Sequence, residues 1–203
     1  MPTSRSEKQN WSIDILRYPT EEDWKRCLML ARATQGKFDA PKEPSLEWKR
    51  KILRSEHSPI RTLMFTIRMN NIPYCNSVHF VRHKYGVEHY VQSQRVNEER
   101  GAERQDAPVT HIMDINAQEL IFMAHKRLCH KADNVTREIM IAIRKAILET
   151  DLDVDEGEAS VWYGVLVPAC KYNLDNCQEF KPCGVYEVVK TASMMKSFLQ
   201  SLY

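Results

Sequence analysis

Five polar side chains near the middle of the chain are of types that bind anions. Arg82, His83 and Lys84 are consecutive, and Ser93 and Arg95 follow after a short spacer. On a β-strand, side chains two residues apart share a face, about 6.6 Å apart along the strand. A hydroxyl and a guanidinium at this spacing can share one phosphate, because arginine offers a planar pair of donors. The cluster indicates local anion binding, with solvated helix-end cations as the alternative.

A second candidate pair lies further along the chain. Asn116 and Arg127 are separated by about three turns of an α-helix, so both fall on one helix face. Met123 falls between them, and an ordinary solvated helix face is the alternative interpretation. His125 and His130 lie near Arg127 but point away from this face, and we interpret them as structural or surface residues.

Three cysteines form a third constellation near the carboxyl end. Cys170, Cys177 and Cys183 do not follow the short Cys-x2–4-Cys spacing of zinc sites, and we assign no metal ligand from spacing alone. Three interpretations remain open. The thiols could be buried in a proline-rich loop, two of them could form a redox-active disulfide, or a histidine elsewhere could complete a metal site.

Hydrophobic periodicity predicts the elements that must carry these residues. Strands are predicted at 61–69 and 88–96, and helices at 20–36, 45–57, 72–82, 116–128, 134–150 and about 188–202. Thr20, Ser45 and Asn116 are suitable N-caps, and Glu119 is predicted to complete a capping box with Asn116. The helix at 72–82 has its apolar spacing at Ile72, Cys75, Val78 and Val81, and 151–158 is an acidic loop. The predicted fold class is α+β, with helices packed around a small, mainly antiparallel sheet.

Composition bounds the class of protein. The chain has 203 residues, of which 43% are hydrophobic, which suits a single domain over 1–203 with a cysteine-containing segment at about 167–203. The net charge of +2 gives no indication of a nucleic-acid partner. The longest apolar run, 161–167, is too short to span a membrane, and no signal sequence is apparent, so we expect a cytoplasmic protein with reduced cysteines. The glycine-rich phosphate loops of Rossmann and P-loop enzymes are missing from the sequence.

Taken in order, these motifs resemble the flavin-dependent thymidylate synthases. That family has an Arg-His-Arg triplet followed by Ser-x-Arg, here "RHK" at 82–84 and "SQR" at 93–95. An upstream Ser-Pro element leads into a strand, here "EHSPIRTLMFTIRM" at 56–69. Downstream, "NAQ" at 116–118 and Arg127 keep the family's spacing, and "REIM" at 137–140 is similar to a later helix. The resemblance covers roughly residues 45–150.

The resemblance implies a function and a set of site residues. Such enzymes are α+β homotetramers that bind FAD, dUMP, methylene-tetrahydrofolate and NADPH, and they methylate dUMP at C5 in active sites shared between subunits. The flavin-contacting positions of the family correspond to Ser58, Arg82, His83, Lys84 and Asn116. The dUMP-holding positions correspond to Ser93, Arg95 and Arg127. Among these, Ser93 and Arg127 are the predicted catalytic residues, because Arg127 would stabilise negative charge on the pyrimidine carbonyl.

Several positions differ from the family pattern. Lys84 replaces the third triplet residue, Val96 follows Arg95 where tyrosine is usual, and the spacer before Ser93 is one residue longer. The segment from 96 to 115 is also short. Two alternatives therefore stay open, namely a divergent relative that modifies another pyrimidine deoxynucleotide, and a non-catalytic nucleotide-binding protein on the same scaffold.

Overall fold

A four-stranded antiparallel sheet forms the base of the molecule. The computed structural model describes residues 10–39, 42–93, 105–150, 160–174 and 176–185. The strands are β1 (Ser12–Arg17), β2 (Met64–Pro73), β3 (Val87–Val91) and β4 (Pro108–Asn116), in the order β1-β2-β4-β3. All three strand pairs are antiparallel, and Ile67 of β2 pairs with Met113 of β4 at the centre. The predicted α+β class is confirmed.

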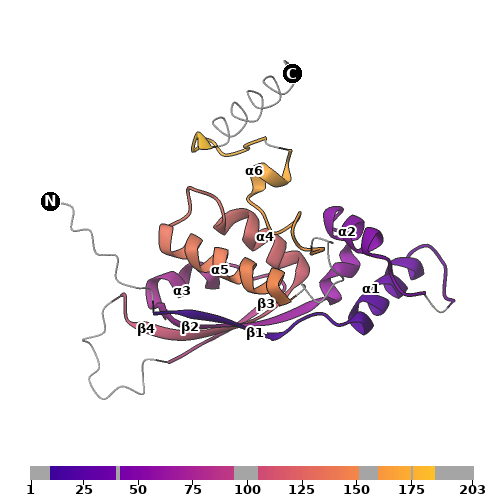
Figure 1. Ribbon diagram of the computed structural model, residues 1–203, viewed down its shortest axis with the longest axis horizontal. Helices are drawn as coiled ribbons and strands as arrows, with labels where there is room; N and C mark the ends of the chain where they lie inside the picture. The colour runs from indigo at the N-terminus through magenta and orange to yellow at the C-terminus, as the bar shows by residue number, and fades with distance from the viewer. Residues whose placement is uncertain (1–9, 40–41, 94–104, 151–159, 175, 186–203) are drawn as a thin grey trace, which may run out of the picture.

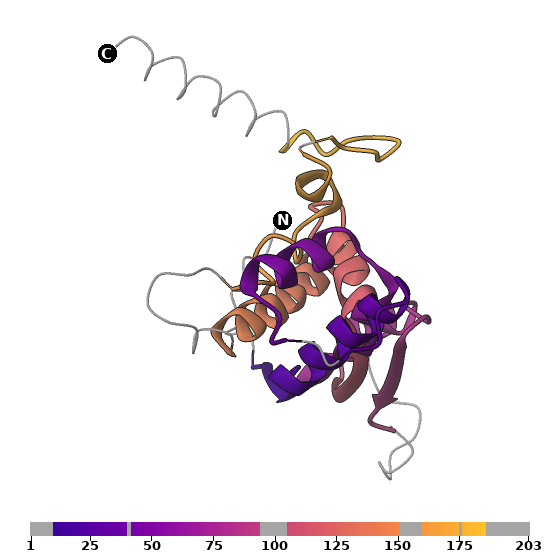
Figure 2. The ribbon, with the colours of Figure 1, turned by 90° about the vertical axis from the view of Figure 1, so that its right-hand side faces the viewer.

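Helices cover one face of this sheet and one of its ends. The helices α3 (Tyr74–Val81), α4 (Ala117–Arg127) and α5 (Asn134–Thr150) lie across the upper face in Figure 1. At the end lie α1 (Glu21–Ala33), α2 (Leu46–Arg54) and the 3₁₀ helix η1 (Ser58–Thr62), and Figure 2 looks onto that end. A four-residue helix, α6 (Ala169–Tyr172), follows near α4. No helix in the described part of the chain is long and apolar enough to cross a membrane.

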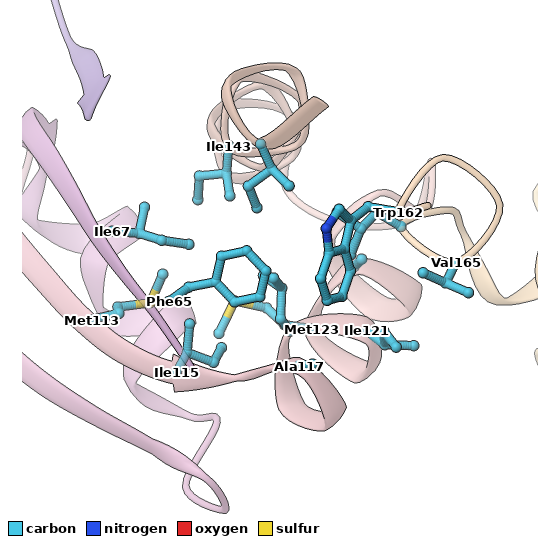
Figure 3. Close-up of a cluster of buried hydrophobic side chains, with 14 of the residues drawn as sticks. Phe65, Ile67, Met113, Ile115, Ala117, Ile121, Met123, Ile143, Trp162 and Val165 are labelled. Atoms are coloured by element: carbon cyan, nitrogen blue, oxygen red, sulfur yellow. The ribbon is translucent and has the colours of Figure 1, made fainter. Parts of the chain in front are cut away.

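The core lies between the sheet and helices α4 and α5. The alternation predicted around β2 is confirmed, because Leu63, Phe65, Ile67 and Met69 are fully buried. Figure 3 shows the sheet side chains facing residues of α4, of α5 and of the segment after α5, among them Met123, Ile143 and Trp162. Burying an aromatic or aliphatic side chain contributes about 1.5–3 kcal/mol. This packing fixes α4 against β4, which is the geometry on which the candidate site depends.

The sequence correctly predicted where several helices begin. Thr20 caps α1 in a full capping box with Asp23, and the Ser45 side chain accepts from the backbone N–H of Trp48 at the start of α2. The strand β2 begins at Met64 rather than at 61, because the 3₁₀ helix η1, with Pro59 in its first turn, runs from Ser58 to Thr62. The acidic segment 151–158 and the helix predicted at about 188–202 lie outside the described residues.

The predicted buried stripe of α3 is wrong. Its buried residues are Asn76, Ser77 and Phe80, whereas Val78 and Val81 are exposed. The two polar residues tolerate burial because each is hydrogen-bonded to a neighbouring element. The Asn76 amide donates to Asp133 and Thr136 at 2.7 and 2.9 Å, and Ser77 bonds to His111 at 3.0 Å. Hydrophobic periodicity cannot detect a helix that packs through polar contacts.

Gly86 makes the turn between α3 and β3 possible. Its φ of +75° lies in the left-handed region, and its carbonyl accepts from the backbone N–H of Asn116 at 2.9 Å. An added Cβ would lie 2.2 Å from the Asn116 side-chain nitrogen. Glycine is therefore required here both for its backbone conformation and for the close approach of α4.

We expect Gly86→Ala to destabilise the protein by about 2–3 kcal/mol, from left-handed strain and from displacement of the Asn116 cap. Gly36→Ala is a matched control, because Gly36 has a φ of +72° and no atom within 4 Å of an added Cβ. It should cost about 1 kcal/mol in backbone strain alone. Urea unfolding measures both, and equal losses would contradict the close contact between Gly86 and Asn116.

Candidate functional site

Three segments that are distant in the sequence meet at the amino-terminal end of α4. The turn at 82–86 contacts this end through the Gly86 carbonyl and the Asn116 N–H. The residue between η1 and β2 contacts it as well, since the Ala117 N–H donates to the Leu63 carbonyl at 2.9 Å. Ser58, which opens η1 just before that strand, is exposed. The predicted site residues Ser58, Arg82, His83, Lys84 and Asn116 therefore lie on segments that meet at this end of α4.

His83 is held between a carboxylate and a guanidinium. Its side chain is only 6% exposed, its Nδ1 lies 2.8 Å from Glu119 Oε1, and Arg127 Nε donates to its Nε2 at 3.1 Å. A ring nitrogen that accepts a hydrogen bond carries no proton, so His83 is neutral with its hydrogen on Nδ1. Protonation of His83 would remove the acceptor for Arg127. We call Glu119, His83 and Arg127 the central triad.

The capping box predicted at the start of α4 is only half correct. Asn116 does cap the helix, because its Oδ1 accepts from the backbone N–H of Glu119 at 2.9 Å. The reciprocal contact is replaced, since the Glu119 side chain bonds to His83 and the Asn116 N–H donates to Gly86. Glu119 is 7% exposed, and a buried carboxylate requires such a partner.

The neighbours of His83 in the sequence have a different environment. Arg82 is the C-cap of α3, and both Arg82 and Lys84 are exposed. Burial, and then the nearby charge of Arg82, lower the pKa of Arg127 from its usual value. Arg127 also donates through Nη2 to the His79 carbonyl at 2.7 Å. The buried, neutral His83 thus orients the guanidinium of Arg127, while its neighbours in the sequence, Arg82 and Lys84, stay exposed.

A second chain of hydrogen bonds fixes the backbone of His83. His89 Nε2 lies 2.9 Å from the His83 carbonyl, so it must donate, and His89 Nδ1 makes a second contact. That nitrogen lies 2.9 Å from His111 Nε2, and His111 Nδ1 lies 3.0 Å from the Ser77 hydroxyl. The chain links α3, β4 and β3 to the peptide group of His83.

The other predicted site residues lie nearby or outside the described chain. Ser93 is exposed and follows the last residue of β3, Val91, by two positions, so it is not part of the predicted longer strand. Arg95 lies outside the described residues. The sequence did not reveal the bonding of Glu119, His89, His111 and Ser77. A weak signal was present for two of them, because His89 and His111 are polar residues within otherwise alternating strand patterns.

Comparison with solved structures identifies the fold. The thymidylate synthase X of Helicobacter pylori with FAD and dUMP matches with a TM-score of 0.54 and 12% identity, over 72% of this chain and 97% of that one. A second structure of the H. pylori flavin-dependent enzyme, also with FAD and dUMP, gives 0.55 and 13%, over 71% and 98%. The UMP/dUMP methylase PolB of Streptomyces cacaoi, bound with 5-Br dUMP, gives 0.53 and 12%, over 69% and 91%. The chain therefore has the fold of these proteins.

Comparison by sequence gives no further assignment. No protein-family model matches the chain, and no curated protein matches it significantly. At 12–13% identity, the match to the solved structures establishes the fold alone. The functional assignment must therefore come from the site itself.

The fully buried His111 predicts a pH-dependent stability. Burial, and then the charge of His89, lower the pKa of His111 from 6.5 to about 4. The unfolded chain therefore binds a proton that the native chain excludes between these values. The contribution is fully present above pH 6.5 and is lost as the pH falls to about 4, by about 3 kcal/mol in all.

We expect His111→Gln to flatten the fall in the free energy of unfolding between pH 6.5 and 4, whatever its cost at neutral pH. His57→Gln is the control, because His57 is exposed and should leave the wild-type slope unchanged. Urea unfolding at several pH values measures both slopes. A wild-type slope in His111→Gln would show that another group causes the pH dependence.

Proposed function

We propose that this chain is an FAD-dependent enzyme that methylates a pyrimidine deoxynucleotide, dUMP in the first instance, at C5. Methylene-tetrahydrofolate and NADPH would be its co-substrates. The observation that carries the proposal is the central triad, in which buried His83 aligns Arg127 while Arg82 and Lys84 stay exposed on either side. The shared fold with proteins crystallised with FAD and dUMP supports it.

The residues present fit the charge of the cofactor. FAD carries a diphosphate, and the exposed Arg82 and Lys84 offer cations beside the amino-terminal end of α4, where helix N–H groups also favour anions. Ser58 and Asn116 would complete the flavin-binding residues. Both ring nitrogens of His83 are bonded within the chain, so we assign it the role of holding Arg127. When bound, FAD would supply the redox chemistry of the methylation.

Arg127 would act on the nucleotide. Two of its five N–H groups donate to His83 and to the His79 carbonyl, which fixes the plane of the guanidinium. Another N–H would donate to a pyrimidine carbonyl oxygen and stabilise the negative charge that develops as C5 becomes nucleophilic. Ser93 and Arg95 would bind the phosphate, the arginine through two parallel hydrogen bonds.

A second candidate is the same chemistry on another pyrimidine deoxynucleotide. Lys84 favours it, because an ammonium is a point charge and cannot grip a phosphate through two parallel bonds as arginine does. The longer spacer before Ser93 also alters the predicted nucleotide side of the site. A non-catalytic binding protein would keep the same contacts without turnover. Incubation with FAD, NADPH, methylene-tetrahydrofolate and each pyrimidine deoxynucleotide, with products identified by mass, separates these functions.

We also propose a homotetramer with shared active sites. The outward face of α3 supports an interface there, because Tyr74, Val78 and Val81 are 38–44% exposed on one helix. Apolar side chains grouped on a helix face commonly mark contact surfaces.

We expect the purified protein to take up FAD and to show oxidised-flavin absorbance. Lys84→Ala should weaken FAD binding about tenfold through loss of a charge-assisted contact, whereas Lys84→Arg should preserve or tighten it. Arg26→Ala is a charge-matched control, because Arg26 is exposed on α1. Fluorescence titration gives the dissociation constants of the wild-type protein and of the three variants. If the purified protein does not bind added FAD, the proposal is refuted.

We expect dUMP to perturb the spectrum of the bound flavin and Arg127→Ala to abolish this response. His83→Asn should weaken the response as well, because Arg127 loses the acceptor that orients it. Circular dichroism of both variants reports whether the fold is retained. An unchanged response in folded Arg127→Ala would contradict the assigned contact with the nucleotide.

A further inference from the structure

The cysteines that the sequence grouped lie around a cavity of about 400 Å³ beyond the carboxyl end of α4. Cys170 and Cys177 are half-buried and Cys183 is exposed, so the interpretation as buried thiols is wrong. Cys129 and His125 also line this cavity. In the described part of the chain, however, no three potential metal ligands converge on one point. The polar cluster that could do further chemistry lies instead between α3 and the start of α5.

This cluster consists of four side chains that are hydrogen-bonded to one another. Asp133 Oδ2 accepts from the backbone N–H and the hydroxyl of Thr136 at 2.9 and 3.0 Å, and from the Asn76 amide at 2.7 Å. The Asn76 amide also donates to Thr136 Oγ1 at 2.9 Å, and His79 Nδ1 lies 2.8 Å from the same oxygen. Hydrogen bonds from the Thr136 N–H, and then from its hydroxyl, lower the pKa of Asp133. The cluster therefore ends on a charged carboxylate, which can only accept hydrogen bonds.

The contacts of the cluster fix the tautomer of His79. The Thr136 hydroxyl has one hydrogen, which it donates to the Asp133 carboxylate. Its oxygen can then only accept from its other partners, so His79 Nδ1 carries a hydrogen and donates it to Thr136. Neutral His79 consequently has a lone pair on Nε2. This nitrogen is not buried, and the described residues provide it with no hydrogen-bond partner.

His79 also lies beside the guanidinium that the proposed function places on the nucleotide. Its carbonyl accepts from Arg127 Nη2 at 2.7 Å, and the same guanidinium donates to His83, one helical turn further along the chain. Both ring nitrogens of His83 are occupied, one by Glu119 and one by Arg127. Of the two histidines to which Arg127 donates, His79 is therefore the one whose ring can still take up a proton.

Methylation at C5 requires a group that takes up a proton. The hydrogen on C5 is replaced by carbon, so the C5–H bond must break once C5 has bonded to the one-carbon unit. Its electron pair stays in the pyrimidine ring, and its proton passes to a base. C5 is a direct neighbour of a carbonyl carbon of the ring. A base beside Arg127 would therefore lie at the correct part of the nucleotide.

We propose that His79 is the base that accepts the C5 proton, a role that rests on the proposed function. Nε2 takes up the proton while Nδ1–H stays on Thr136, and the imidazolium is stabilised by the charge of Asp133 on the far side of the hydroxyl. A base oriented by a further group that ends in a carboxylate is a recurrent catalytic arrangement. After the product leaves, the proton passes from Nε2 to solvent. The step involves no oxidation or reduction.

The test is the release of tritium from 5-tritiated dUMP by the full-length protein with FAD, NADPH and methylene-tetrahydrofolate. His79→Asn should lower kcat about 100-fold and leave the KM for dUMP within about twofold. The asparagine amide keeps a donor to Thr136 but has no nitrogen that accepts a proton. His130→Asn is the matched control, because His130 is an exposed histidine in the turn after α4, and it should keep the wild-type kcat.

Chemical rescue separates a catalytic role from a structural one. Imidazole in solution should raise tritium release by His79→Ala about tenfold and should leave release by Arg127→Ala unchanged. Failure of this rescue, or release by His79→Asn at the wild-type rate, would overturn the assignment of His79 while the proposed function stands. A wild-type protein that releases no tritium would overturn the proposed function together with this role.

The tautomer can be tested without turnover. Nitrogen NMR of the histidine-labelled protein should show the neutral His79 ring with its hydrogen on Nδ1, because Thr136 accepts from that nitrogen. A neutral ring with its hydrogen on Nε2 would have no lone pair toward the nucleotide, and this result would overturn the proposal whatever the activity of the protein.

Discussion

The bond between neutral His83 and Arg127 is the interaction on which the candidate site depends. It joins the loop after α3 to the last turn of α4, and it exists only while Nε2 carries no proton. Glu119 holds the hydrogen of the ring on Nδ1 and thereby selects the tautomer that accepts from arginine. A half-buried arginine would otherwise lose part of its solvation without a partner. The triad thus holds Arg127 in one orientation.

The second histidine chain makes this arrangement rigid. The His83 side chain is fixed by α4, while its carbonyl is fixed through His89 and His111 by β3 and β4. Of the three rings, only that of His83 must be neutral, because a hydrogen on its Nε2 would face the Arg127 N–H. Arg82 and Lys84 flank a fixed residue, so their cationic groups start from defined positions.

Local chemistry in the sequence was sufficient to predict much of the fold. Caps such as Thr20 and the alternation in β2 depend on neighbouring residues, and the structure confirms them. The environment of His83 depends on Glu119 and Arg127, which are remote in sequence, and a run of Arg-His-Lys gives no sign that its middle residue is buried. For the same reason, hydrophobic periodicity did not predict that α3 packs through polar side chains. Long-range hydrogen bonds decide which polar residues can be buried, and spacing along the chain does not encode them.

One helix borders both the candidate site and a cavity lined by cysteines. At the carboxyl end of α4, Arg127 faces His83, whereas His125 and Cys129 line the cavity. Residues two apart on a helix point to different sides, so Arg127 does not share a face with either of them. The last turn of α4 is closed by the Leu128 N–H, which donates to the Ala124 carbonyl at 3.0 Å. This closed turn holds the backbone of Arg127, and the orientation of the guanidinium then depends on His83 and on the His79 carbonyl.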